Sequence, residues 1–144
     1  MIVYLAHGKH HQHDGKWIQY QIEGWGHTVY NPFDGSDHAK QLTKAWEKAA
    51  EKNDLEKMRQ LCKPIFEKDN AAIKKCDVVV AYYPDPSPGT SMEISIAKLV
   101  YYKRVIVMTN MIHPFVETLA NYVLPENDNG LEQLQELLER LERK

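Results

Sequence analysis

Val78-Val79-Val80-Ala81-Tyr82 is an uninterrupted apolar run, and it decides the fold because no polar residue alternates within it. A strand of this kind is buried on both faces, as in a parallel sheet that is covered by helices on each side. Two further runs share the pattern, Ile2-Val3-Tyr4-Leu5-Ala6 and Val105-Ile106-Val107-Met108. The sequence therefore predicts that these runs are central strands of one parallel sheet.

Helical periodicity and turn residues predict the elements between these strands. They are a helix over 14–25, a strand over 27–30, helices between 37 and 76, a helix over 90–102, a helical piece near 115–120, a strand over 122–124 and a C-terminal helix. Pro64 is expected to begin or kink the last helix before residue 76. The helix over 90–102 is expected to carry one apolar side, formed by Met92, Ile96, Leu99 and Val100.

Strands that alternate with helices imply right-handed crossovers within a parallel sheet. We therefore expect a single α/β domain over residues 1–144. Its architecture is predicted to be a flavodoxin-like three-layer fold with a five-stranded parallel sheet of order 2-1-3-4-5.

The composition is ordinary for a soluble globular domain, with 43% apolar and 26% charged residues. Eighteen Lys+Arg against twenty Asp+Glu give a net charge of −2, which argues against nucleic acid as a partner. Cys62 and Cys76 form no CxxC motif, which favours a reducing compartment. The first apolar run is too short for a signal peptide or a membrane span. These features predict a cytoplasmic protein without a membrane partner.

Two loops of unusual composition follow the first and third predicted strands. In an open parallel sheet, ligands bind beyond the carboxyl ends of the strands, where residues 7–13 and 84–89 are expected to meet. The first loop contains Lys9 and the histidines His7, His10, His11 and His13. These histidines leave three interpretations open: a metal site, a solvated loop, or contact with an anion or phosphate. No set of cysteines or carboxylates completes the first of these, so we expect no metal.

Glu93 follows the second loop, in the segment Gly89-Thr90-Ser91-Met92-Glu93. One interpretation is a capping box, in which Thr90 caps the helix and Glu93 bonds back to its backbone N–H. The other places Glu93 in the first helical turn, where the helix N-terminus favours its ionised form. A carboxylate held there is suited to attack an electrophilic sugar carbon.

Asp69 interrupts an apolar helical stripe formed by Ile65, Ile73 and Cys76. The helix could be rotated so that Asp69 faces solvent. If Asp69 is instead partly buried, desolvation and a nearby Glu93 would raise its pKa and suit it to donate a proton. A pair of carboxyl groups with separated pKa values is typical of enzymes that cleave glycosidic bonds.

Taken together, these residues resemble the nucleoside 2-deoxyribosyltransferase family and the related 2′-deoxynucleoside 5′-monophosphate N-hydrolases. The stretches that carry the resemblance are Ile2-Val3-Tyr4-Leu5-Ala6, Gly26-His27-Thr28-Val29, Asp69 eight residues before Asp77, and Gly89-Thr90-Ser91-Met92-Glu93-Ile94. The resemblance covers roughly residues 1–124. It implies that Glu93 is the nucleophile, that Asp69 assists protonation of the departing base, and that no metal or cofactor takes part. It also implies a homodimer or larger homo-oligomer.

Two positions depart from the transferase pattern. Six residues before the nucleophile, transferases have an aspartate near the sugar 5′ oxygen, whereas this chain has Ser87. The arrangement Pro86-Ser87-x-Gly89 is more similar to the N-hydrolases, in which a serine faces a phosphate. His113 aligns with an asparagine that transferases supply to the neighbouring subunit. The residues that we expect to contact substrate are Tyr4, His7, Gly8, Lys9, Ser87, Gly89 and His113.

The resemblance therefore implies an enzyme of nucleotide salvage, a nucleoside 2-deoxyribosyltransferase. Such an enzyme cleaves the N-glycosidic bond of 2′-deoxynucleosides or their 5′-monophosphates through a covalent glutamyl-deoxyribose intermediate, and passes the sugar to another nucleobase. Its partners would be a small deoxynucleoside or deoxynucleotide and a nucleobase. Two alternatives stay open: a 2′-deoxynucleoside 5′-monophosphate N-hydrolase that passes the sugar to water, and a non-catalytic nucleotide-binding module.

Overall fold

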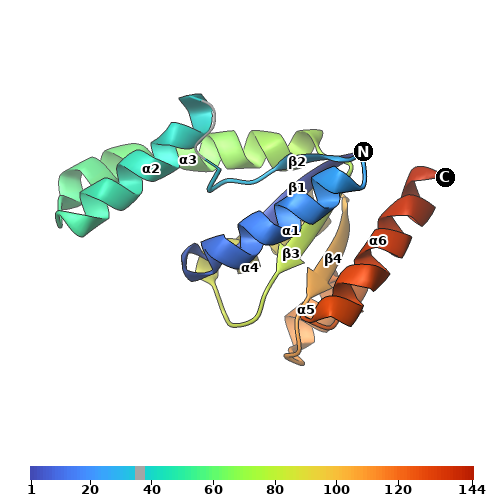
Figure 1. Cartoon of the computed structure of the whole chain (residues 1–144). Helices are drawn as coiled ribbons and strands as arrows, with labels where there is room; N and C mark the ends of the chain where they lie inside the picture. Colours follow the sequence, from blue (N-terminus) through green and yellow to red (C-terminus); the bar gives the residue numbers. More distant parts are fainter. Residues whose placement is uncertain (35–37) are drawn as a thin grey trace.

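The computed structural model describes residues 1–34 and 38–144 (Figure 1). Its elements are β1 (Ile2–His7), η1 (Lys9–His11), α1 (Gln12–Gly24), β2 (Thr28–Tyr30), α2 (His38–Glu51), α3 (Leu55–Lys75), β3 (Val78–Tyr82), α4 (Pro88–Ser95), η2 (Ile96–Val100), β4 (Arg104–Met108), α5 (Pro114–Leu119), β5 (Tyr122–Leu124) and α6 (Asp128–Glu142). Among them, η1 is a 3₁₀ helix and η2 a π-helix. The predicted start of the helical region at residue 37 lies outside the described residues.

The five strands form one sheet of order β2-β1-β3-β4-β5, and every neighbouring pair is parallel. This order and the α/β class confirm the prediction of a flavodoxin-like fold. In the register of the sheet, Tyr4 of β1 lies beside Tyr30 of β2 and Val79 of β3. Tyr4 therefore stands where the chain's first three strands run side by side.

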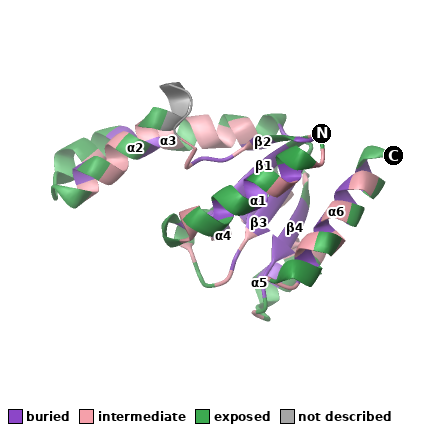
Figure 2. Ribbon diagram, in the orientation of Figure 1, coloured by how far each residue is buried: buried purple, intermediate pink, exposed green. Residues whose placement is uncertain are grey.

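The strands β1, β3 and β4 are largely buried between two layers of helices (Figure 2). Because successive strand residues point to opposite faces, Val3, Leu5, Val78 and Val80 pack on the side of α1 and α6. The partners that these helices contribute are Ile18, Ile22, Leu134, Leu137, Leu138 and Leu141. The other face carries Tyr4, Ala6, Val79 and Ala81, and it packs against Ile73, Ile94, Ala97 and Val116 from α3, α4, η2 and α5. Tyr4 is thereby directed toward the layer that contains α3 and α4.

Helices α2 and α3 form a hairpin that extends past the sheet (Figure 1). Pro64 lies inside α3, which is continuous over 21 residues, so the prediction that Pro64 begins a new helix was wrong. The helix begins instead after Asp54, whose side chain accepts a hydrogen bond from the backbone N–H of Lys57 at 3.1 Å. Within a helix a proline lacks one backbone donor, and its ring crowds the carbonyl group four residues earlier.

Helix α4 begins at Pro88, two residues before the predicted start, with Ser87 in extended conformation as its N-cap. Proline suits the first helical position because its φ angle is already fixed near the helical value. The predicted apolar side was wrong in part, because Ile94 and Ala97 are buried whereas Met92, Leu99 and Val100 are exposed. The helix widens into η2 at Ile96, and this change of period rotates the following side chains.

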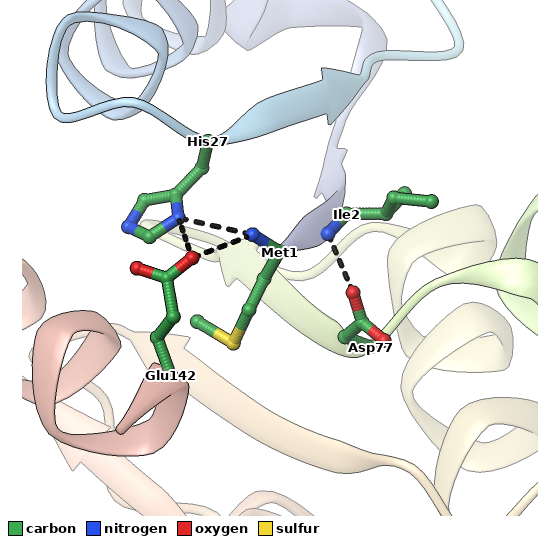
Figure 3. Close-up of polar contacts among 5 residues, drawn as sticks. All are labelled: Met1, Ile2, His27, Asp77 and Glu142. Atoms are coloured by element: carbon green, nitrogen blue, oxygen red, sulfur yellow. Dashed lines mark hydrogen bonds and ion pairs between the residues drawn. The ribbon is translucent and has the colours of Figure 1, made fainter. Parts of the chain in front are cut away.

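Polar contacts join the amino ends of the strands (Figure 3). The backbone N–H of Ile2 donates to Oδ2 of Asp77 at 2.6 Å, which links the start of β1 to the residue before β3. The amino group of Met1 donates to Oε1 of Glu142 at 3.1 Å and lies 3.4 Å from Nδ1 of His27. These contacts lie at the edge of the sheet opposite to the loops that follow the strands. Within the described ranges, no helix has the length and apolar character to cross a bilayer.

Candidate active site

The loops after β1 and β3 meet, as the fold predicts. A Cβ atom on Gly8 would lie 3.3 Å from both Cβ and Oγ of Ser87, so the two loops are in van der Waals contact. A second contact joins them, because Nε2 of His11 lies 3.0 Å from Oδ2 of Asp85. Gly8 and Ser87 therefore lie side by side at the carboxyl edge of the sheet.

His7 holds the first loop in place. Its ring is buried and makes contacts of 3.0 Å at both nitrogens, from Nδ1 to the carbonyl oxygen of Gly8 and from Nε2 to Oδ1 of Asn31. The ring of Phe33 stacks on it with centroids 4.8 Å apart. Gly15 packs on the other side so closely that a Cβ atom would lie 2.4 Å from the ring. Burial lowers the pKa of His7, whereas its hydrogen bonds to Gly8 and Asn31 act in the opposite direction. The two contacts of the ring fix the loop in place.

The remaining loop residues lie nearer the surface. Lys9, His10 and His13 are exposed, and the ammonium of Lys9 lies 5.6 Å from the ring centroid of Trp46 in α2. This cation–π contact connects the loop to the α2–α3 hairpin. Across the described part of the chain, no group of three or more histidine, cysteine or acidic side chains is placed to hold a metal ion.

Glu93 lies in the second turn of α4, the helix that packs on the sheet face carrying Tyr4. It is the sixth residue of α4 and belongs to the second turn, so the capping-box interpretation was wrong. Oε2 of Glu93 and the hydroxyl of Tyr4 are both buried, and neither has a hydrogen-bond partner among the described residues. Burial raises the pKa of Glu93 to about 8, and the negative charge of Asp69 raises it too, whereas the Tyr4 hydroxyl and Lys68 lower it.

The raised pKa contradicts the expectation that the helix N-terminus keeps the Glu93 carboxyl group ionised. The field of a helix dipole falls off within the first turn, and Glu93 lies one turn further along. Desolvation of a buried carboxylate is the larger effect at that depth. Burial therefore favours the protonated form of Glu93 in the free protein.

Asp69 is partly buried, with 17% of its side chain exposed, so the solvent-facing interpretation was wrong. Its Oδ1 accepts a hydrogen bond from the hydroxyl of Tyr30 at 3.1 Å and another from Nζ of Lys68 at 2.6 Å. Burial raises the pKa of Asp69, as predicted, while Lys68 and Tyr30 act in the opposite direction. The rings of Tyr30 and Tyr4 are stacked with centroids 5.4 Å apart, which connects Asp69 to the Tyr4 hydroxyl and Glu93.

Sequence reasoning did not identify Tyr30 and Lys68 as parts of this site. A lysine next to Asp69 on a charged helix is expected to face solvent, yet only 8% of the Lys68 side chain is exposed. Tyr30 had a usable signal, because it ends the strand that pairs with β1 and stands opposite Tyr4.

Ser87 and Gly89 lie where the second loop enters α4. Although Ser87 is the N-cap residue, its side chain makes no capping hydrogen bond, and its hydroxyl lies against Gly8. Its carbonyl oxygen accepts a hydrogen bond from Oγ of Ser91 at 2.8 Å. A Cβ atom on Gly89 would lie 3.8 Å from Oε1 of Glu93, so the loop passes close to the carboxyl group.

His113 is placed apart from these residues. It is the N-cap of α5, where its Nδ1 accepts a hydrogen bond from the backbone N–H of Phe115 at 3.2 Å. It lines a groove of about 550 Å³ between α4, η2 and α5, together with Ser91, Ile94, Leu99 and Phe115. Glu93 does not line this groove. The structure therefore brings Tyr4, Asp69 and Glu93 together, with Gly8, Ser87 and Gly89 next to them. His113 of the α5 N-terminus instead lies at a groove on another side of α4.

No protein-family model and no curated protein matches the sequence. Among solved structures, the chain is similar to a 2-deoxyribosyltransferase from Bacillus psychrosaccharolyticus, with a TM-score of 0.64 and 14% identity over 94% of this chain and 90% of the other. It is similar to the CMP N-glycosidase BcmB of Clostridium botulinum, with a TM-score of 0.60 and 21% identity over 95% and 99% of the two chains. The chemotaxis protein CheY4 of Vibrio cholerae is also similar, with a TM-score of 0.54 and 16% identity over 98% of each chain. At these identities the similarities show a shared fold, and any function must be argued from the site itself.

Proposed function

We propose that this chain cleaves the N-glycosidic bond of 2′-deoxynucleosides or their 5′-monophosphates and passes the sugar to another nucleobase. The observation that carries the proposal is the carboxyl group of Glu93, buried beside Tyr4 and Asp69 with Oε2 unbonded by any described residue. A buried carboxyl group without a donor is costly to maintain for stability alone, and it is suited to bond a ligand atom. Two similar structures, one named as a 2-deoxyribosyltransferase and one as a CMP N-glycosidase, support the same chemistry.

The chemistry divides into two displacements at the anomeric carbon. In the first, a Glu93 carboxylate oxygen bonds to C1′ while the C1′–N bond breaks and its electron pair passes to the base. Asp69 donates a proton to the departing base, and the stacked Tyr4 and Tyr30 keep the two carboxyl groups in place. In the second displacement, a nitrogen of another base attacks C1′ while the C1′–O bond to Glu93 breaks, and Asp69 accepts the proton that this nitrogen loses.

A second candidate is a 2′-deoxynucleoside 5′-monophosphate N-hydrolase, in which water performs the second displacement. The contact between Ser87 and Gly8 favours it, because the Ser87 hydroxyl makes no capping bond and lies against the loop that follows β1. A hydroxyl can donate to a phosphate oxygen, and backbone N–H groups at the start of a helix favour an anion. Both candidates use Glu93 and Asp69 in the same roles.

Both candidates fit self-association through the face that carries the groove. Leu99 and Phe115 are 61% and 73% exposed, and Val100 beside them is exposed as well. An apolar surface of this kind is typical of an interface. We therefore propose a homodimer or larger homo-oligomer, and light scattering that finds only monomers at all concentrations would reject it.

The substitution Glu93→Gln tests the nucleophile. Glutamine preserves the shape of the side chain but cannot form the covalent intermediate, so release of free base should fall at least a hundredfold. Base release is measured by chromatography on deoxynucleosides and on their monophosphates, with the wild-type chain as reference. Activity within tenfold of wild type would contradict the role of Glu93. No release by the wild-type chain from either substrate class would favour the non-catalytic nucleotide-binding module.

The same variant has a stability signature that is independent of activity. Because the folded chain raises the pKa of Glu93 from 4.5 to about 8, the wild-type protein should lose stability as pH rises through this range. Glutamine does not titrate, so the melting temperature of Glu93→Gln should fall less between pH 5 and pH 9 than that of wild type. Parallel curves for the two proteins would show that Glu93 is not a buried titrating group.

The substitution Ser87→Asp tests the preference for a phosphate. We expect the wild-type chain to have a kcat/KM at least tenfold higher for monophosphates than for nucleosides, a difference of about 1.4 kcal/mol. An aspartate at this position should reduce or reverse the preference, because it repels the phosphate. Ser87→Ala is the matched control, since it removes the hydroxyl without adding charge and should keep part of the preference. Wild-type cleavage of nucleosides as fast as monophosphates, with base exchange faster than hydrolysis, would favour the transferase.

A further inference from the structure

Lys68 is a buried cation beside the two carboxyl groups of the site. Only 8% of its side chain is exposed, and its Nζ lies 2.6 Å from Oδ1 of Asp69 and 6.0 Å from the ring centroid of Tyr30. A lysine loses most of its hydration in such a place and stays charged only where a partner compensates. Asp69 is that partner.

The hydrogen bonds are distributed unequally over the two carboxyl groups. Both donors to Asp69, Lys68 and Tyr30, reach the same oxygen, Oδ1, and no described residue donates to Oδ2. Oε2 of Glu93 is buried, and no described residue donates a hydrogen bond to it. Donors that carry or share positive charge stabilise a carboxylate, so a negative charge is better accommodated on Asp69 than on Glu93.

We propose that Lys68 is a positioning residue that decides where the proton of the Asp69–Glu93 pair resides. Its ammonium and the Tyr30 hydroxyl keep Asp69 ionised and leave the proton on Glu93 while the site is empty. The free Oδ2 of Asp69 is then the acceptor to which this proton passes when substrate enters. Lys68 itself touches neither the base nor the sugar in this scheme.

The proposal deepens the proposed function and rests on it for its catalytic consequence. Glu93 must lose its proton before an oxygen can attack C1′, and Asp69 must gain one before it can protonate the departing base. Transfer of a single proton from Glu93 to Oδ2 of Asp69 satisfies both needs without changing the charge of the site. Because Lys68 and Tyr30 occupy Oδ1, the transferred proton is directed to the oxygen that is free to face the ligand.

The charged and titratable groups around the pair come from each element that packs on it. They are Tyr4 of β1, Tyr30 of β2, and Lys68 of α3. Burial raises the pKa of both carboxyl groups, and Lys68 lowers both. Removing the charge of Lys68 should therefore raise the pKa of Asp69 and that of Glu93 together.

The test is a pH titration of the full chain by carbon-13 NMR of the side-chain carboxyl groups. In the wild type, Asp69 should titrate below Glu93. In Lys68→Gln, which keeps a donor but removes the charge, both pKa values should rise by about one unit or more. Lys68→Arg should stay near wild type. Lys63→Gln is the matched control, because Lys63 lies on the same helix with 85% of its side chain exposed and should change neither titration.

Kinetics supply a second readout. The reactive form holds one proton on the pair, so kcat/KM should fall on the acid side as Asp69 is protonated and on the alkaline side as Glu93 loses its proton. In Lys68→Gln both limbs should move to higher pH, by the same amounts as the two titrations. A uniform loss of rate at every pH, with unmoved titrations, would mean that Lys68 only supports α3 and would overturn the proposal.

The order of the two wild-type titrations tests the proposal even if Lys68→Gln fails to fold. Asp69 titrating above Glu93 would overturn it. These measurements need no turnover, so a chain that releases no base but shows the expected titrations would reject the proposed function and retain the role of Lys68. If the wild-type chain releases base but Lys68→Gln leaves both titrations unchanged, the proposed function is retained and the role of Lys68 is rejected.

Discussion

The stacking of Tyr4 in β1 on Tyr30 in the edge strand β2 is the contact on which the site depends. The parallel register of β1 and β2 places the two rings side by side on the face covered by α3 and α4. From there, Tyr30 bonds Asp69 on α3, and the Tyr4 hydroxyl lies against Glu93 on α4. Two carboxyl groups that are 24 residues apart in the sequence are thus held by one pair of rings.

Burial in this arrangement has an electrostatic consequence. The carboxyl groups of Asp69 and Glu93 share an apolar layer with a single buried ammonium, that of Lys68, among the contacts described. Desolvation and mutual repulsion then favour a state in which the pair holds one proton. A site of this kind is prepared for proton transfer without a change in its total charge, which suits the cleavage of a bond to a neutral base.

Much of the fold could be predicted from the sequence, because apolar runs such as Val78–Tyr82 and the alternation of strands and helices leave few arrangements. The start of α4 was misplaced, since Pro88 rather than Thr90 begins the helix, and with it the turn that carries Glu93. The burial of the Glu93 carboxyl group depends on how α4 packs on the sheet. Periodicity in the sequence alone does not specify that packing. The same limit applies to Lys68, whose burial depends on the angle at which α3 crosses Tyr30.

The central claim is that Glu93 forms a bond to the anomeric carbon of a deoxyribose. Mass spectrometry of the intact chain tests it most directly, after rapid acid quenching during turnover of a 2′-deoxynucleoside 5′-monophosphate or of the nucleoside. The account predicts an added mass equal to that of the sugar portion, located by peptide mapping on the segment that contains Glu93. Release of base without this adduct at any quench time, or an adduct on a different residue, would contradict the account.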